Sequence, residues 1–441
     1  MNLSFIKKID FLKILFLIAV SAIFFMYSTS YYHNCFPNCY AWKEMMIKWS
    51  DGDFVRRGLL GTVFYALEPT IPIKFSAVFF NYVCVLFCSY VIYYNLHKLD
   101  LPKWIFVSII FSPSLILFNL HYTLVLKKDI VSIAGCLLIL ILIKFYWDRI
   151  SLKRKTISIK DCFVFILIYC YVFSFILLCY EVFIVFVPFL SLYTFYVMAR
   201  NFSIRLAVKV SLLLGVISFF LFFALTIPYV GDEVVVSKLV MDWHRLYPNL
   251  RVFVDGLTKV NGAPDPFTFM MMTPEQYKNY YLYIHSITNY FELVLVYILM
   301  IVPLSLMIKF KLVCVVLPLN IDFWVRKHKI VSLLVVLVTV HFPLLLSIVA
   351  FDYGRWLILS FYLMVFFVCF FTEKNQSVSF RQSFLSSAIC WFVSILYVIA
   401  WKPHHWAGGG GFLISFGNFD LFKNLFVFYS NFNYTYGLLF N

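Results

Sequence analysis

Apolar residues form runs of roughly 17 to 25 along nearly the whole chain, and short polar turns separate them. Runs of that length match the hydrocarbon core of a bilayer, which is about 30 Å thick. Because lipid offers no water to backbone amides, such continuous runs predict spanning helices. The alternation typical of barrel strands does not occur in them. The predicted spans are 11–31, 76–96, 104–122, 130–147, 162–180, 182–199, 206–229, 286–308, 330–350, 357–372 and 383–401.

The fold class predicted by this pattern is all-α. We expect a polytopic transmembrane bundle of about 11 spans (10–12), built as a single integral membrane domain over 1–441. Composition agrees, because 63% of the residues are hydrophobic and only 13% are charged. A soluble domain carries about 25% charged residues. An ordinary globular protein is therefore excluded.

The distribution of Lys and Arg predicts the orientation of the chain. Lys7, Lys8 and Lys13 flank the first span, which places the N-terminus in the cytoplasm under the positive-inside rule. With this start, the inner segments carry the whole net charge of +15, and the outer segments are balanced. Topology and contact with anionic lipid explain the inner cations, so no nucleic-acid partner is expected. The first apolar run lacks a small-residue cleavage site, and we expect it to be a retained helix.

Two predicted outer segments are long, and long ordered loops are usually functional. They cover 32–75 and 230–285, and a third outer segment, 402–441, either lies in the interface or crosses once more. Cys35 and Cys39 lie in the first of these loops. A disulfide between them and two free thiols both remain open. No metal site is expected, because only one histidine stands near these cysteines.

The first long loop contains the sequence WSDGDFVRRGLLG, with a turn expected at its start. From Phe54 onward the pattern predicts an amphipathic helix on the membrane surface. Asp51 or Asp53 could act as a general base for a sugar hydroxyl. Arg56 and Arg57 could bind a phosphate through their planar forks. The alternative is a surface helix whose arginines meet lipid headgroups.

Further charged residues gather at predicted outer ends of spans. Lys127 and Lys128 run against the orientation rule, so they either bind an anionic ligand such as a diphosphate or extend to the interface. Glu181 stands in a very tight turn near the membrane, where an acidic residue is costly and is by default a candidate functional group. It could be a second acid or base, or merely a turn residue. Asp352 and Arg355 are three residues apart, and we expect them to pair on one helix face. Arg355 could then contact a phosphate, or Asp352 could merely cap the helix.

The second long loop and the C-terminal segment hold the remaining candidates. Arg245 and Arg251 lie in the second loop among many tyrosines, a composition that suits carbohydrate. His404 and His405 stand beside a tryptophan and suit either sugars or an ordinary membrane interface. His341 is expected to be a buried histidine with satisfied hydrogen bonds in the middle of a span.

An outer active face has no access to ATP, and the sequence contains no P-loop. The layout resembles the GT-C superfamily of membrane glycosyltransferases, including the bacterial O-antigen polymerases. Those enzymes typically carry an acidic residue in the first outer loop, where Asp51 and Asp53 stand here. Some O-antigen polymerases show an Arg, ten residues and a Gly, a spacing that this chain has at Arg245 and Arg251. The large loops come earlier here than is usual in polymerases, which leaves polymerase and single-sugar transferase both open.

The resemblance implies glycosyl transfer from an undecaprenyl-linked glycan on the periplasmic side of the bacterial inner membrane, in surface polysaccharide assembly. Asp51 or Asp53 would activate the acceptor hydroxyl, with Glu181 as a second acid or base. Positive charge would stabilise the departing diphosphate, supplied by Arg56, Arg57, Lys127, Lys128 and Arg355. No cofactor and no metal are expected, and a chain-length regulator is a candidate partner.

Three alternatives to a polymerase stay open. A serotype-converting transferase would use a monophosphate-linked sugar on the same fold. A transporter or flippase would show ionisable residues within spans and interrupted helices. An acyltransferase would use His404 or His405 as its base.

Overall fold

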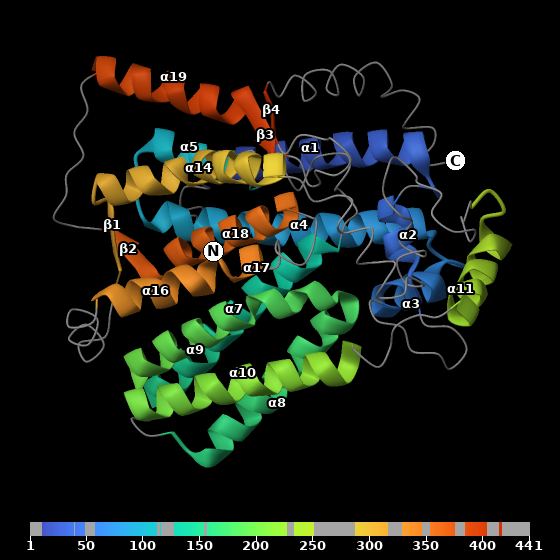
Figure 1. The fold of residues 1–441 in the computed structure, drawn as a ribbon, viewed down its shortest axis with the longest axis horizontal. Helices are drawn as coiled ribbons and strands as arrows, with labels where there is room; N and C mark the ends of the chain where they lie inside the picture. The colour runs from blue at the N-terminus through green and yellow to red at the C-terminus, as the bar shows by residue number, and fades with distance from the viewer. Residues whose placement is uncertain are drawn as a thin grey trace, which may run out of the picture.

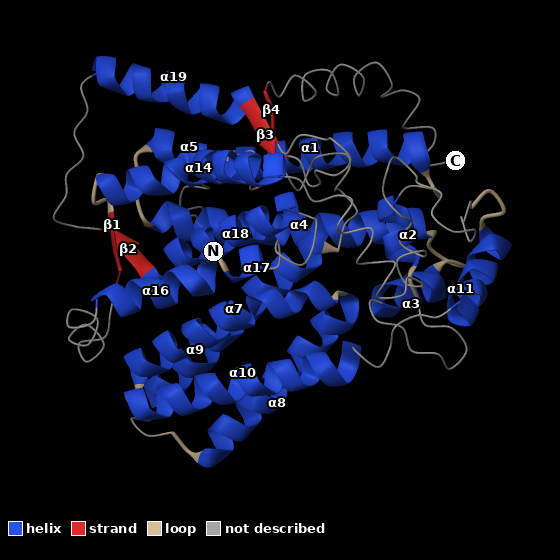
Figure 2. Ribbon diagram, in the orientation of Figure 1, coloured by secondary structure: helices blue, strands red, loops and turns tan. Residues whose placement is uncertain are grey.

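The computed structural model describes residues 11–38, 40–48, 58–112, 115, 128–153, 157–226, 233–250, 287–315, 329–345, 353–374, 384–403 and 414–416. Helices dominate these residues, and strands occur at only two places among them (Figure 2). The first half contains α1 (Phe11–Cys35), α2 (Tyr40–Met46), α3 (Gly58–Leu67), α4 (Ile73–Lys98), α5 (Lys103–Ile110), α7 (Asp129–Lys153), α8 (Ile159–Cys179), η2 (Glu181–Phe186), α9 (Val187–Asn201) and α10 (Ile204–Thr226). The second half contains α11 (Glu233–Leu246), α14 (Ile287–Lys309), α16 (Lys329–Val340), α17 (Phe342–Leu345), α18 (Tyr353–Phe371) and α19 (Phe384–Ala400).

A helix lies in every predicted span, so the all-helical fold class is confirmed. Among the described residues, 5 helices are long and apolar enough to cross a membrane. They are Ile73–Lys98, Asp129–Leu152, Ile159–Cys179, Glu181–Asn201 and Ile204–Thr226. The apolar parts of the other helices are shorter, so the number of crossings stays a prediction.

Two predicted spans are interrupted, and proline chemistry accounts for both. The run 104–122 begins as α5, but that helix ends at Ile110 because Ser112 precedes a proline and such residues avoid the helical region. The run 330–350 begins as α16, which stops at Val340, and the short α17 follows after His341. Pro343 in α17 has no amide hydrogen with which to continue the ladder.

In Figure 1 most of the helices run across the width of the view and lie one above another. α4 is central and packs against α1, α5, α7 and α18. α8, α9 and α10 form one flank with η2, and α5, α14 and α19 form the other. The short helices α2, α3 and α11 gather at one end of the bundle (Figure 1).

Large apolar side chains cover the outward faces of the flanking helices. On α10 they recur with the helical period, at Leu212, Val216, Phe220 and Phe223, and all four are exposed. A soluble monomer rarely shows such a continuous apolar surface. Lipid is the solvent that suits this face, and the fold is therefore compatible with a membrane protein.

Two short strand pairs stand where the hydropathy pattern predicts no strands. β1 (Val313–Val315) pairs with β2 (Thr372–Lys374), and β3 (Trp401–Pro403) pairs with β4 (Ile414–Phe416), both antiparallel. The first pair joins the ends of α14 and α18, and Lys374, the last residue of β2, forms an ion pair with Asp100. Three-residue strands tie helix ends together without forming a larger sheet.

Candidate functional site

A buried ion pair links the starts of α7 and α18. Nε of Arg355 lies 3.2 Å from Oδ1 of Asp129, and the two side chains expose only 8% and 14% of their surface. The expected partner Asp352 lies outside the described residues, and within them the ion-pair partner of Arg355 is Asp129. Removing two charges from water costs several kcal/mol per ion, roughly what their attraction returns. Such a pair is therefore weak evidence for stability and stronger evidence for a role.

Two further charged residues lie at the same end of these helices. Lys128 immediately precedes α7 and is fully buried. Glu181 is also buried and begins η2, which packs against α7. We call Lys128, Asp129, Glu181 and Arg355 the charge cluster; each has at least one polar or electrostatic partner.

The backbone explains how Glu181 reaches this position. Tyr180 alone separates α8 from η2, and its extended conformation (φ −162°, ψ 111°) turns the chain sharply. The next helix therefore starts at once, with its first carboxylate held inside the bundle. An acidic residue at a helix start is favoured by the positive end of the helix dipole.

Buried polar groups without a partner flank the charge cluster. Among the described residues, Oγ of Ser132, Nε1 of Trp356 and Oγ of Ser360 are buried and make no hydrogen bond. Ser132 lies one turn after Asp129, and Trp356 follows Arg355 directly. Buried polar groups normally find a partner. These three groups can therefore serve a polar ligand or water beside the ion pair.

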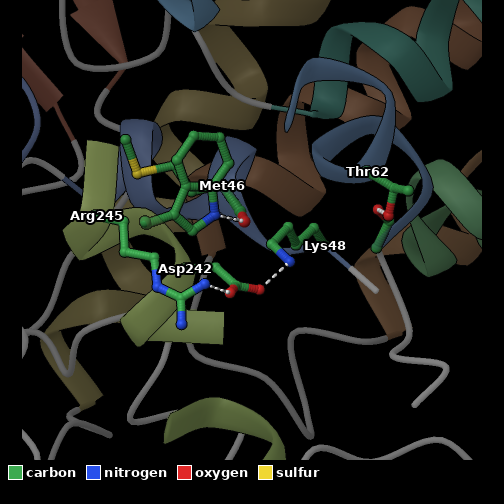
Figure 3. Close-up of polar contacts among 7 residues, drawn as sticks. Met46, Lys48, Thr62, Asp242 and Arg245 are labelled. Atoms are coloured by element: carbon green, nitrogen blue, oxygen red, sulfur yellow. Dashed lines mark hydrogen bonds and ion pairs between the residues drawn. The ribbon is translucent and has the colours of Figure 1, made fainter. Parts of the chain in front are cut away.

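The two long loops meet in a second polar site, which we call the loop junction. It consists of α2, α3 and α11, together with Lys48 after α2 and Tyr247 after α11. Nζ of Lys48 lies 2.5 Å from Oδ2 of Asp242 on α11, and both face each other in Figure 3. The Lys48 ammonium also stands 4.2 Å from the centre of the Tyr65 ring. Next to it, Nε1 of Trp243 donates to the carbonyl oxygen of Met46 at 2.7 Å.

Polar contacts also hold the residues that follow α11. The hydroxyl of Tyr247 hydrogen-bonds Oε1 of Glu68, and Oε2 of the same carboxylate accepts from the amide of Ile73. Nδ2 of Asn38 donates to the carbonyl oxygen of Asn249 at 3.1 Å. The loops thus contact each other through specific side chains rather than as independent linkers.

A glycine allows the close approach within the loop junction. A Cβ on Gly61 in α3 would stand 2.0 Å from the carbonyl oxygen of Ile47. α3 also packs against α4 and α8. Since α8 ends at Cys179, two residues before Glu181, the loop junction lies against the helix that leads into the charge cluster.

Three predicted site residues are buried at the starts of α7, η2 and α18: Lys128, Glu181 and Arg355. Arg245 does not join them; it lies on α11 with 78% of its side chain exposed, 3.9 Å from Asp242. The remaining predicted site residues lie outside the described part of the chain: Asp51, Asp53, Arg56, Arg57, Lys127, Arg251, Asp352, His404 and His405. The segment that holds the first four runs between Lys48 and Gly58, and both of these residues are buried.

Sequence reasoning missed Asp129, Lys48 and Asp242 as paired residues. Asp129 follows a lysine pair and resembles an ordinary helix-start carboxylate, so no local signal marks its distant partner. For Asp242 a signal existed, because the apolar residues of α11 (Val236, Leu239, Val240 and Trp243) share one face and predict packing against another element.

Both ring nitrogens of His341 have hydrogen-bond partners, as expected, but the residue does not lie in the middle of a continuous helix. Its Nε2 hydrogen-bonds the hydroxyl of Tyr297, and Nδ1 lies 2.7 Å from the carbonyl oxygen of Leu337. The side chain is half-buried at the break between α16 and α17. That break packs close to the charge cluster, because α17 contacts both η2 and α18.

Metal-binding geometry is not seen in the part of the chain that the structure describes, where no three His, Cys, Asp or Glu side chains gather. The eight cysteines with described side chains are free thiols in helices. Cys39 and the side chain of Cys35 lie outside that part, so the predicted disulfide alternatives stay open.

Comparisons of the chain with known protein families, with curated proteins and with solved structures give no match.

Proposed function

We propose that the protein is a multi-pass inner-membrane glycosyltransferase, with about eleven spans and a cytoplasmic N-terminus. It would transfer sugar from an undecaprenyl-diphosphate carrier on the periplasmic face. One observation carries the proposal: a buried ion pair joins the starts of α7 and α18, and a buried lysine and a buried glutamate lie at the starts of α7 and of η2, which packs against α7. In the proposed topology all three starts face the periplasm, as does the loop junction. Ionisable residues inside a membrane bundle are by default functional candidates.

The charge cluster suits the chemistry of a phosphate leaving group. Arg355 and Lys128 would stabilise the negative charge that develops on the diphosphate, a large term in a water-excluded site. Asp129 would hold the Arg355 guanidinium in place, and the polar groups of Ser132 and Ser360 would contact the substrate. Arg56 and Arg57, in the segment next to Lys48, would add to the phosphate site.

The transfer step balances without a cofactor. The bond between the anomeric carbon and the phosphate oxygen breaks, and a bond forms between that carbon and an acceptor hydroxyl oxygen. The hydroxyl proton passes to a carboxylate, for which Asp51, Asp53 and Glu181 are the candidates. The diphosphate leaves as an anion on its lipid.

Within this class, a polymerase of O-antigen-like repeat units is the primary proposal. The alternative is a serotype-converting transferase that uses a monophosphate-linked sugar. Deletion of the gene and gel analysis of surface polysaccharide distinguish them. A polymerase predicts loss of the long ladder with a single repeat unit retained. The side-chain transferase predicts an intact ladder with altered serology, and unchanged glycans would refute both.

Point variants test the site itself. Arg355→Ala, Glu181→Gln, Asp51→Asn and Asp53→Asn should each lower polymer yield at equal protein level in the membrane. Arg205→Ala is a matched control, because that arginine is exposed at the opposite end of the bundle. If the control lowers yield as much as Arg355→Ala, a general loss of membrane assembly explains the effect instead.

A transporter of lipid-linked glycan is the second candidate, and one observation favours it. The helix break at His341 stands beside the charge cluster, and interrupted helices line the central sites of many transporters. A transporter predicts that deletion leaves the lipid-linked repeat unit on the cytoplasmic leaflet. A glycosyltransferase predicts that the unit reaches the periplasm and stays unpolymerised.

A further inference from the structure

Two deeply buried polar groups lie one turn apart on α18. The indole Nε1 of Trp356 and the hydroxyl of Ser360 make no hydrogen bond among the described residues, although the two residues expose only 5% and 0% of their surface. A spacing of four residues places both on one face of the helix. Trp356 follows Arg355 directly, so the two groups lie within the same two turns as the buried ion pair with Asp129.

Buried hydroxyls elsewhere in the bundle do find a partner. Those of Ser108 and Ser218 donate to the carbonyl oxygen four residues earlier in their own helices, at 2.8 and 2.7 Å. On α18 itself, the buried hydroxyl of Tyr362 donates to the carbonyl oxygen of Leu115 at 2.7 Å. Ser360 makes neither kind of bond within the described part of the chain. Its hydroxyl is therefore available to a ligand in a way that these others are not.

Neutral buried groups of this kind suit a neutral ligand that is rich in oxygen. An indole N–H only donates, whereas a serine hydroxyl both donates and accepts. The hydroxyl and carbonyl oxygens of a sugar meet both groups, while an isoprenoid tail offers no acceptor. A phosphate is bound better by cations, which form stronger, charge-assisted hydrogen bonds. Arg355 and Lys128 provide such cations at the start of α18 and directly before α7.

We propose that Trp356 and Ser360 form a sugar subsite and determine which sugar is accepted. The inference rests on the proposed function, since the sugar would be the one that the lipid diphosphate carries. Each of the two side chains would bind an oxygen of the sugar, and the phosphate would lie toward Arg355. Such a site rejects a sugar that lacks the matching oxygen, because a buried polar group would then stay unpaired.

The test compares two lipids as probes of the full-length protein in nanodiscs. One is the undecaprenyl-diphosphate-linked glycan extracted from a strain without the gene, and the other is undecaprenyl diphosphate itself. Trp356→Phe and Ser360→Ala should each weaken binding of the glycan-bearing lipid by at least about threefold, the loss expected for one neutral hydrogen bond. Binding of the bare diphosphate should stay within about twofold of that of the unaltered protein.

Trp147→Phe is the matched control. Trp147 is fully buried on α7, and its Nε1 also makes no hydrogen bond among the described residues. It lies about 27 Å along the helix from Asp129, at 1.5 Å per residue. Both tryptophan variants lose the same ring volume and the same N–H, so their Tm values should shift similarly, but only Trp356→Phe should weaken binding of the glycan. Ser360→Ala should leave the Tm unchanged or raise it, because it removes a buried hydroxyl that lacks a hydrogen bond.

Three results would overturn the subsite. Equal weakening for both lipids would mean that Trp356 and Ser360 contact the phosphate instead of the sugar. Unchanged binding of the glycan-bearing lipid in both variants would mean that they contact neither. A lower Tm of Ser360→Ala would mean that the hydroxyl has a partner in the ligand-free protein. Failure of the unaltered protein to bind either lipid is a different result, which would refute the proposed function and the subsite with it.

Discussion

Arg355 and Asp129 connect the starts of two helices that lie far apart in the chain, with Nε and Oδ1 separated by 3.2 Å. The pair is buried, and among the described residues the hydroxyls of Ser132 and Ser360 and the indole nitrogen of Trp356 make no hydrogen bond. Burying an ion pair costs desolvation free energy, and polar groups beside it without a hydrogen bond add to that cost, so packing alone does not explain the arrangement. It suits a site whose charges are held ready for a ligand.

Removing one member of this pair should destabilise the protein strongly. Arg355→Ala or Asp129→Ala leaves a buried charge without its ion-pair partner, and we expect a loss of about 3–5 kcal/mol. Thermal unfolding of the purified protein in detergent measures the change. The double variant Asp129→Leu/Arg355→Leu should be more stable than either single variant, while glycan synthesis stays lost. Additive losses in the double variant would contradict a direct pairing.

The loop junction predicts a measurable coupling between Lys48 and Asp242. Lys48→Met and Asp242→Asn should each lower stability by roughly 1–3 kcal/mol, because each leaves a largely buried polar partner behind. A double-mutant cycle should show a coupling of at least about 0.5 kcal/mol. Arg245→Ala is the control, because Arg245 approaches the same carboxylate from an exposed position and should have little effect.

Gly61 should not tolerate a side chain. Gly61→Ala would place a Cβ 2.0 Å from the carbonyl oxygen of Ile47, so α3 would have to move away from the backbone that follows α2. We expect a loss of about 1–3 kcal/mol or misfolding, measured by thermal unfolding. Gly215→Ala is a matched helical control, since its Cβ would stand 3.3 Å from a serine hydroxyl. Equal effects of the two substitutions would show that helix-glycine chemistry, not close approach, decides the outcome.

The proposed orientation can be tested at two exposed positions. Met241 on α11 is 58% exposed and Leu152 on α7 is 88% exposed. In a background without reactive native cysteines, Met241→Cys should react with a membrane-impermeant thiol reagent in intact spheroplasts, and Leu152→Cys should react only after lysis. The reverse pattern would place the charge cluster at the cytoplasmic face, where a periplasmic glycosyl transfer is impossible.

The sequence predicted the positions of the helices well, because apolar runs of that length leave the backbone no other way to satisfy its hydrogen bonds in lipid. The start of α7, the tight turn at Glu181 and the start of α18 all follow from where each apolar run begins. The same pattern failed near Ser112 and His341, where proline interrupts a run whose hydropathy continues. Hydropathy measures the preference for lipid and does not record a missing amide hydrogen.

Sequence alone also marked Lys128, Glu181 and Arg355 as unusual, since each is a charge at the edge of an apolar run. Only the tertiary structure decided their partners. Asp129 meets Arg355 and Lys48 meets Asp242 because helices distant in sequence pack side by side, and no local spacing encodes such a contact. Local hydropathy thus determines where most of the helices lie, except where proline interrupts an apolar run, whereas the choice of neighbour depends on side-chain packing and charge pairing across the whole bundle.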